Sequence, residues 1–267
     1  MASALEGPAS VSLGVIMLSQ LGPVARRLKY LGMDCEEELQ ALLVLVKFKG
    51  RVRRGQDIVK AGCSSHFSTV LLNGSACRYR ITENGRRQIF TFRYPGDFCD
   101  FDRHGLAGTD DAVGALSECS IGIIFHEDLE RIAVKSPKLV LALWRDAMVE
   151  ASIFRERLLN VGQRPALPRI ANLICEQMVR LESVGMNGSM IPLTQVDLAD
   201  AAALSAVHMN RTVQDLRDLG LLARTSRMIE VAQRDRLLDI AKFDGRYLNI
   251  PPSKSQWASP DWARSYH

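Results

Sequence analysis

The chain has 267 residues, of which 47% are hydrophobic and 24% are charged, enough for two domains with their own cores. No apolar run approaches the roughly 18 to 20 residues that span a bilayer. Residues 1–20 lack the early positive charges of a secretory signal and are expected to form a tail. We therefore expect a cytoplasmic protein with no membrane partner, and the net charge of +4 is too small to identify nucleic acid.

The six cysteines are scattered without the paired spacing of a zinc or iron–sulfur site, so we expect reduced thiols and no cofactor. Cys77 and Cys119 are interpreted as small core residues. The sequence also lacks a glycine-rich phosphate loop, a nucleophile elbow and a metalloprotease helix. We therefore expect no enzyme.

Residues 21–137 change from helical to strand-like patterning. Residues 21–46 place leucines at helical spacing and predict one or two short helices. Short alternating segments follow near Val52 and at 58–59, 68–72, 77–82, 88–93 and 119–125. Asn73-Gly74 and Asn84-Gly85 predict hairpins, because both residue types tolerate positive φ. The fold class is therefore α+β, with an N-terminal β-roll over residues 21–137.

Acidic residues cluster in the loop after Pro95-Gly96. Cys99, Asp100, Asp102 and His104 offer thiolate, carboxylate and imidazole groups, all of which can bind a metal or serve a redox site. Their spacing matches no metal template, so a solvated loop is the favoured interpretation.

A long helix is predicted over residues 138–162, with one apolar seam at 4-3-3-4-3 spacing. The seam could lie on the chain's own β-domain or form a homodimer interface, and we favour the second. A break at 162–168 predicts a hinge, about which a signal would rotate the C-terminal domain. The seam residues are Trp144, Met148, Ala151, Phe154, Leu158 and Val161.

Residues 163–242 predict a winged helix-turn-helix. A helix at 169–184, opened by Pro168, is followed by helices at 195–201 and from Ser205, with a turn at 202–204. Thr194 and Ser205 can cap these two helices, and Asp197 completes a capping-box-like pattern. Strands at 221–225 and 228–231 predict the wing, and 234–242 a final helix. Residues 243–267 form the C-terminal tail, which is expected to be loosely ordered from Gly245 although Trp257 and Trp262 could dock it.

The outward face of the second helix suits a DNA major groove. Asn210 or Gln214 can pair with adenine and Arg211 with guanine, while Ala206 and Val207 can meet a thymine methyl group. Helix N-termini and basic side chains would add phosphate contacts, although an ordinary helical hairpin has similar spacing. The candidate DNA-binding residues are Thr194, Ser205, Ala206, Val207, His208, Asn210, Arg211, Gln214 and Arg227.

The stretch LTQVDLADAAALSAVHMNRTVQDLRDLGLL, residues 193–222, resembles the DNA-binding domain of the Crp-Fnr family of bacterial transcription regulators. RRGQDIVKAG and LLNGSACRYRITENGRRQIFTFRYPGDF resemble the cyclic-nucleotide-binding domain of the same family. The resemblance implies a homodimer on a two-fold site in double-stranded DNA, with helix 138–162 at the dimer interface and RNA polymerase as a further partner.

The sequence departs from the family pattern at several positions. Ala203 replaces the usual glycine of the inter-helix turn, which is costly if that turn needs positive φ. Only Arg211 matches the usual base-reading side chains, so the preferred DNA site should differ. Asp100-Phe101 and Thr109-Asp110 stand where nucleotide-binding members carry Gly-Glu and Arg-Ser pairs.

An anionic phosphate beside these aspartates, with no matching arginine, would be disfavoured, so we expect no cyclic-nucleotide binding of the usual kind. The effector is unknown. An alternative function is a ligand or thiol-redox receptor whose helix-turn-helix makes protein contacts.

Overall fold

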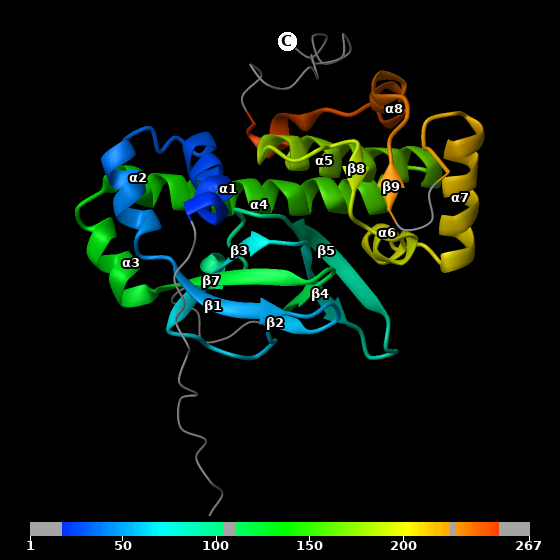
Figure 1. Cartoon of the computed structure of the whole chain (residues 1–267). Coiled ribbons are helices and arrows are strands. Elements are labelled where there is room, and N and C mark those ends of the chain that lie inside the picture. Colours follow the sequence, from blue (N-terminus) through cyan, green and yellow to red (C-terminus); the bar gives the residue numbers. More distant parts are fainter. Residues whose placement is uncertain (1–17, 104–110, 225–227, 251–267) are drawn as a thin grey trace, which may run out of the picture.

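The computed structural model describes residues 18–103, 111–224 and 228–250. A β-roll lies beneath two long helices, with short helices at one end and the C-terminal helices at the other (Figure 1). The mixed helix and sheet architecture agrees with the predicted fold class. None of the helices in the described ranges is long and apolar enough to span a bilayer.

The β-roll consists of two antiparallel sheets, ordered β1-β7-β3 and β2-β6-β4-β5. Six of its strands coincide with the predicted segments. Strand β6 was not predicted, because its four small and apolar residues show little alternation. The strands are β1 (Lys47–Val52), β2 (Asp57–Val59), β3 (Phe67–Asn73), β4 (Ala76–Ile81), β5 (Arg87–Arg93), β6 (Ala112–Ala115) and β7 (Cys119–Phe125).

The two Asn-Gly turns differ in their roles. Asn84-Gly85 closes a hairpin, because β4 pairs with β5. The hairpin predicted at Asn73-Gly74 was wrong. Strand β3 pairs with β7, and this turn carries the chain into the other sheet. Gly74 has φ +92°, and a Cβ there would lie 2.5 Å from the Glu118 carbonyl oxygen. Packing against the segment before β7 therefore fixes this turn.

Helices α1 (Leu18–Tyr30), α2 (Glu36–Leu43) and α3 (His126–Ala133) pack with the start of α4 (Pro137–Gln163) against the β-roll. α4 is 27 residues long and is capped by the Ser136 side chain. α5 (Ala166–Ser183) follows after only Arg164 and Pro165. The predicted break at 162–168 was therefore too long. Gly162 remains helical, and Pro168 fits the first turn of α5, where no backbone N–H is needed.

α5 is buried on nearly all sides between Ile170 and Leu181. One continuous hydrophobic core joins its side chains to Ile89 and Phe92 of the β-roll and to the C-terminal helices. Any rotation about Arg164-Pro165 would have to open this shared core. The sequence predicted a helix here, but not that nearly all of its faces would be covered.

The C-terminal part contains α6 (Gln195–Ala202), α7 (Ala206–Asp218) and α8 (Arg234–Ala241). Strand β9 (Ile229–Glu230) pairs with β8 (Met190–Ile191), and a single bridge joins Leu222 to Val231. The second wing strand was thus predicted, but its main partner β8 was missed because it is only two residues long. The predicted wing tip at 225–227 lies outside the described residues.

The chain after α8 packs back onto the long helices. The 3₁₀ helix η2 (Gly245–Leu248) carries Tyr247, whose hydroxyl donates a hydrogen bond of 3.0 Å to Glu176 of α5. Leu248 and Ile250 are buried in the shared core. The expectation of loose order from Gly245 was therefore wrong for residues 245–250. Trp257 and Trp262 lie outside the described residues.

Candidate nucleic-acid interface

The two helices of the predicted helix-turn-helix begin at well-formed caps. The Thr194 hydroxyl accepts the Asp197 backbone N–H at 3.2 Å, and the Asp197 carboxylate accepts the Thr194 N–H at 3.0 Å. The Ser205 hydroxyl accepts the His208 N–H at 3.2 Å. Capping satisfies one of the four free amides at each helix start, and the positive end of each helix dipole remains there. Both predicted caps are confirmed.

The turn between α6 and α7 requires a left-handed residue. Ala203 has φ 54° and ψ 40°, and its N–H is bonded to the Ala199 carbonyl oxygen. A left-handed conformation costs an L-residue roughly 1 to 2 kcal/mol, whereas glycine adopts it freely. Ala203 is thus strained at the position where the replacement of the family's usual glycine predicted a cost in stability.

Substitution Ala203→Gly is therefore expected to raise the free energy of unfolding by about 0.5 to 1 kcal/mol, the strain relieved less the larger unfolded-state entropy of glycine. Denaturant titration of the two proteins measures the difference. Ala232→Gly is a matched control, because Ala232 is exposed but does not have positive φ. If both substitutions lower stability alike, Ala203 is not strained in solution.

The outer face of α7 is open to solvent. Val207 is 82% exposed, its neighbours in the reading face are exposed as well, and Gln214 is half-buried. The inner face is buried through Met209, Val213 and Leu216, as the spacing predicted. The predicted reading residues that the structure brings together on the exposed face are Ser205, Ala206, Val207, His208, Asn210 and Arg211.

The polar side chains of this face make few hydrogen bonds within the described part of the chain, and those lie at the surface. The Asn210 amide donates to Gln195 at 3.3 Å and the Gln214 amide donates to Asp218 at 2.7 Å, both at the surface. The Arg211 side chain makes no hydrogen bond or ion pair within the described part of the chain. DNA bases can compete for such groups at low cost. Arg227 lies outside the described residues.

The acidic residues of α6 are neutralised from the β-roll. Arg87 of β5 donates to Asp197 at 2.9 Å and to Asp200 at 2.7 Å. This pairing was not predicted from the sequence. No signal within one segment identifies a partner more than a hundred residues away.

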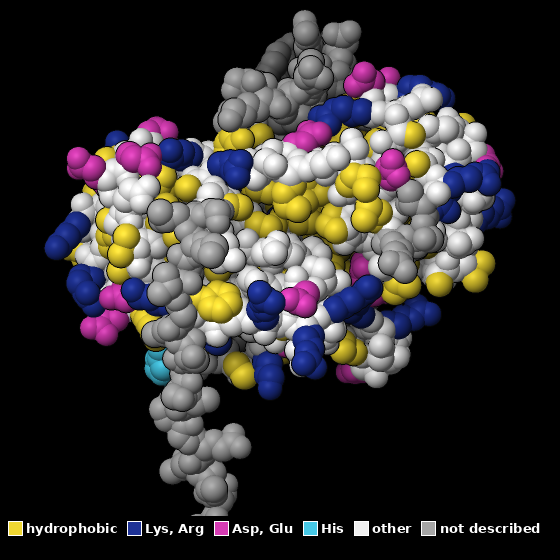
Figure 2. All heavy atoms as spheres, in the orientation of Figure 1, with side chains coloured by type: hydrophobic (Ala, Val, Ile, Leu, Met, Phe, Trp, Pro, Cys, Tyr) yellow, Lys and Arg dark blue, Asp and Glu magenta, His cyan; other side chains and the backbone are white. Residues whose placement is uncertain are grey.

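The apolar seam of α4 faces solvent. Trp144 is 61% exposed and Leu158 is 75% exposed, whereas Val149 and Ile153 on the other side of the helix are buried. Trp144, Met148 and Leu158 of the seam therefore do not cover the chain's own β-domain, whereas Phe154 contacts Phe90 of β5 with ring centroids 6.2 Å apart. Figure 2 shows hydrophobic side chains gathered in the middle of this face, over α4 and beside β8. The remaining seam residues are exposed, as Met148 is, or half-buried, as are Ala151, Phe154 and Val161.

Two acidic residues in the loop after Pro95-Gly96 are paired with a buried arginine of the β-roll. Arg78 of β4 is buried and binds Asp102 with two hydrogen bonds of 2.5 and 2.7 Å. It also lies 3.4 Å from Asp111 and 3.2 Å from Glu150 of α4. No arginine stands where the family's Arg-Ser pair would bind a cyclic phosphate, but Arg78 of β4, a partner that the sequence did not predict, pairs with these acids. The protein's own guanidinium, rather than a ligand, meets their charge.

The solvated-loop interpretation of Cys99 and Asp100 was also wrong. Both are buried, and the Asp100 carboxylate accepts the Thr69 backbone N–H at 2.6 Å. Cys77 and Cys119 are buried as predicted, and burial raises the pKa of the Cys77 thiol to about 12, which disfavours the reactive thiolate. The described residues contain no group of three potential metal ligands, and His104 lies outside them.

A second buried cluster ties the β-roll to the long helices. Asp97, after β5, accepts hydrogen bonds from Arg180 of α5 at 2.7 Å and from the Tyr94 N–H at 2.9 Å. Arg27 of α1 lies 3.7 Å from Asp97 and 2.6 Å from Asp146 of α4. Four elements distant in sequence are thereby joined through paired charges.

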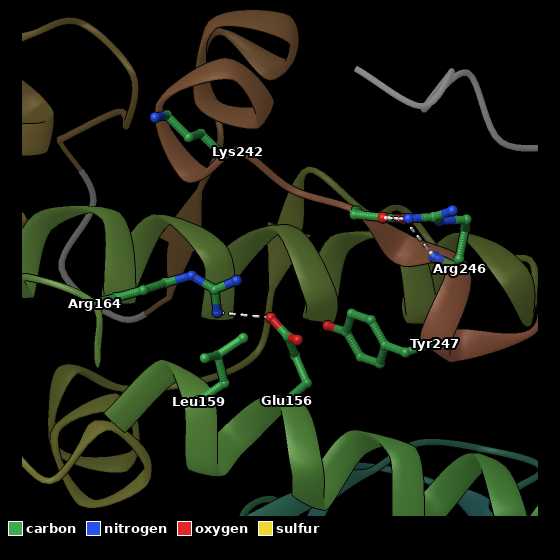
Figure 3. A pocket seen from close by; sticks show the side chains of 7 residues that line it. Glu156, Leu159, Arg164, Lys242, Arg246 and Tyr247 are labelled. Atoms are coloured by element: carbon green, nitrogen blue, oxygen red, sulfur yellow. Dashed lines mark hydrogen bonds and ion pairs between the residues drawn. The ribbon is translucent and has the colours of Figure 1, made fainter. Parts of the chain in front are cut away.

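A pocket of about 450 Å³ lies where α4, the α4–α5 junction and η2 meet (Figure 3). Arg164 and Glu156 form an ion pair of 2.6 Å in its wall, and Tyr247 lies beside them. Arg246 is paired with Asp244 at 2.5 Å. Most of the charged side chains that line this pocket are thus paired with one another.

Comparison with known proteins matches residues 168–240 to the Crp-like helix-turn-helix domain. The transcriptional activatory protein AadR of Rhodopseudomonas palustris is 28% identical over 180 residues, 65% of this chain and 70% of that protein. The transcriptional activator FnrL of Cereibacter sphaeroides is 27% identical over 79% of this chain and 87% of its own length. The solved structure of FixK2 from Bradyrhizobium japonicum has the same fold, with a TM-score of 0.63 at 23% identity, covering 71% of this chain and 94% of that one.

Proposed function

Because this chain is a DNA-binding transcription regulator of the Crp-Fnr family, we propose that it acts as a cytoplasmic homodimer presenting two α7 helices to successive major grooves of a two-fold DNA site. The observation that carries this proposal is the exposed face of α7. On this face the Arg211 side chain makes no hydrogen bond or ion pair with other described residues. Regulators of this family bind DNA and act as dimers. We propose RNA polymerase as a further partner and assign no catalytic activity.

The exposed seam of α4 supports the dimer. An unpaired row of large apolar side chains on a 27-residue helix is the surface that a second copy of the same helix would cover. Two-fold symmetry then places the two reading helices in a fixed relation, so their separation sets the half-site spacing.

We further propose that the protein is not controlled by cyclic AMP in the usual way. The buried Arg78 already compensates Asp102 and Asp111, and Glu150 of α4 lies against the same guanidinium. A cyclic phosphate entering here would have to displace these ion pairs and meet the released carboxylates.

Selection of random duplex DNA by the purified reduced protein, without added ligand, tests the proposed function. An inverted repeat with half-site centres about one helical turn apart is the expected product. The absence of any enriched DNA site would favour the alternative, a receptor whose helix-turn-helix makes protein contacts.

Substitution Arg211→Ala is expected to cost about 1 to 3 kcal/mol of binding at one base pair in each half-site and to relax the preference there. The lost interaction is the paired hydrogen bonding of a guanidinium with a guanine edge. Competition binding with duplexes altered at each position measures the effect. Arg224→Ala is a control, because Arg224 is an exposed arginine outside α7. Unchanged discrimination by the Arg211 variant would remove this residue from the reading face.

A further inference from the structure

We propose that the β4–β5 hairpin of the β-roll completes the DNA-binding surface, with Arg87 neutralising the acids of α6 and Arg86 contacting a backbone phosphate beside the start of α7. This inference rests on the proposed function, because it assumes that the face of α7 meets DNA. It adds a contact from the opposite half of the chain to that function.

The charge of the helix-turn-helix leaves room for such a contribution. Between residues 194 and 227 there are four aspartates and four arginines, so this stretch has no net positive charge. A neutral surface does not by itself attract the phosphate backbone, which supplies a large share of the affinity of a protein for a duplex. Basic groups from outside this stretch would therefore strengthen binding.

Arg87 supplies the first of these groups. Its guanidinium bridges Asp197 and Asp200 at 2.9 and 2.7 Å, so Arg87 alone pairs two of the four carboxylates. The hairpin is held in place next to α6, because the neighbouring Gln88 amide reaches the Ala201 carbonyl oxygen at 3.5 Å. Both contacts come from β5, on the same strand that packs into the shared core.

Arg86 supplies the second basic group. A cleft of about 680 Å³ separates the hairpin tip from the helix-turn-helix, with Asn84 and Arg86 on one side and Ser205 and Ala206 on the other. Arg86 is exposed, and its side chain makes no hydrogen bond or ion pair within the described residues. Asp200 also lines this cleft, with its carboxylate paired to Arg87 at 2.7 Å. The free guanidinium of Arg86 and the positive end of α7 are therefore left to attract a phosphate group.

The hairpin lies beside the reading face and does not cover it. Val207 and Asn210 remain exposed with the hairpin in this position. In Figure 1 the β4–β5 hairpin extends below α6 and toward the end of the molecule that carries α7. The geometry therefore favours an added contact over obstruction of DNA.

The test is the salt dependence of duplex binding by the full-length protein, measured by fluorescence anisotropy with the selected site and with a random duplex. Arg86→Ala is expected to weaken binding to both duplexes on the order of tenfold at low salt, because phosphate contacts carry no sequence information. The slope of log Kd against log salt should fall by about one per protomer. Arg86→Lys keeps the charge and should retain the slope.

Lys135→Ala is the matched control, because Lys135 is an exposed cation after α3, at the opposite end of the molecule from α7 (Figure 1). An unchanged slope in Arg86→Ala overturns the inference, and tighter binding shows that the hairpin obstructs DNA instead. Site-selective binding with an unchanged slope would leave the proposed function intact. A slope that depends on Arg86 but comes without any preferred DNA site would contradict the proposed function and leave the role of the hairpin. If the protein binds neither duplex, the proposed function and the role of the hairpin are both contradicted.

Discussion

A double substitution in the α4 seam, Met148→Glu with Leu158→Glu, is expected to yield a monomer whose affinity for a two-fold DNA site is about 10² to 10⁴ times weaker. The loss equals the advantage of tethering two half-site contacts in one particle. Both side chains are largely exposed in the protomer, at 47% and 75%, so their replacement leaves the protomer's own core intact. In a dimer the new carboxylates would be desolvated against apolar partners, which carries a large free-energy cost.

Light scattering coupled to gel filtration measures the mass of the variant, and anisotropy measures its affinity for a two-fold site and for an isolated half-site. The half-site affinity should not change, because α7 is untouched. Val134→Glu is the matched control, since Val134 is 86% exposed but lies outside the seam. A double variant that stays dimeric would place the interface elsewhere.

Truncation of Arg180 to alanine is expected to lower the free energy of unfolding by about 3 to 5 kcal/mol, the usual cost of breaking a buried ion pair. Arg180 donates to Asp97 at 2.7 Å and to the Thr91 hydroxyl at 3.3 Å, and both partners are buried. The variant would leave the Asp97 carboxylate with Arg27 at 3.7 Å as its remaining ion-pair contact within 4 Å among the described residues. Arg131→Ala is the control, because that exposed pair with Asp128 is worth less than about 1 kcal/mol.

The loss should depend on pH. Burial by itself would raise the pKa of Asp97, but Arg180, Arg27 and Arg93 together hold it below the ordinary value. An aspartate with a lowered folded-state pKa contributes stability above its unfolded-state pKa and loses it as the pH falls through the folded-state value. The difference between wild type and Arg180→Ala should therefore be full at pH 7 and shrink below about pH 4. Denaturant titrations across this range measure the difference in the free energy of unfolding. A small difference that does not change with pH would contradict the assignment.

Local patterns in the sequence determined the elements around the proposed interface. Helical spacing and capping residues placed α6 and α7, because a cap such as Thr194 with Asp197 acts within one turn of backbone. The Asn84-Gly85 turn identified its hairpin for the same reason, since two residues with the right φ preferences suffice. The strain at Ala203 was also visible as an alanine where a turn needs positive φ.

Only the tertiary structure decided which partners these elements meet. Asn73-Gly74 looks like a hairpin locally, yet packing against the segment before β7 sends the chain to another sheet. Arg78 joins Asp102 and Asp111, and Arg87 joins Asp197 and Asp200, across separations that no periodicity records. The burial of nearly every face of α5 follows from elements before and after it closing around one core. Capping and turn preferences act over a few bonds, whereas ion pairing and burial depend on distances in space, and the folded chain alone sets those.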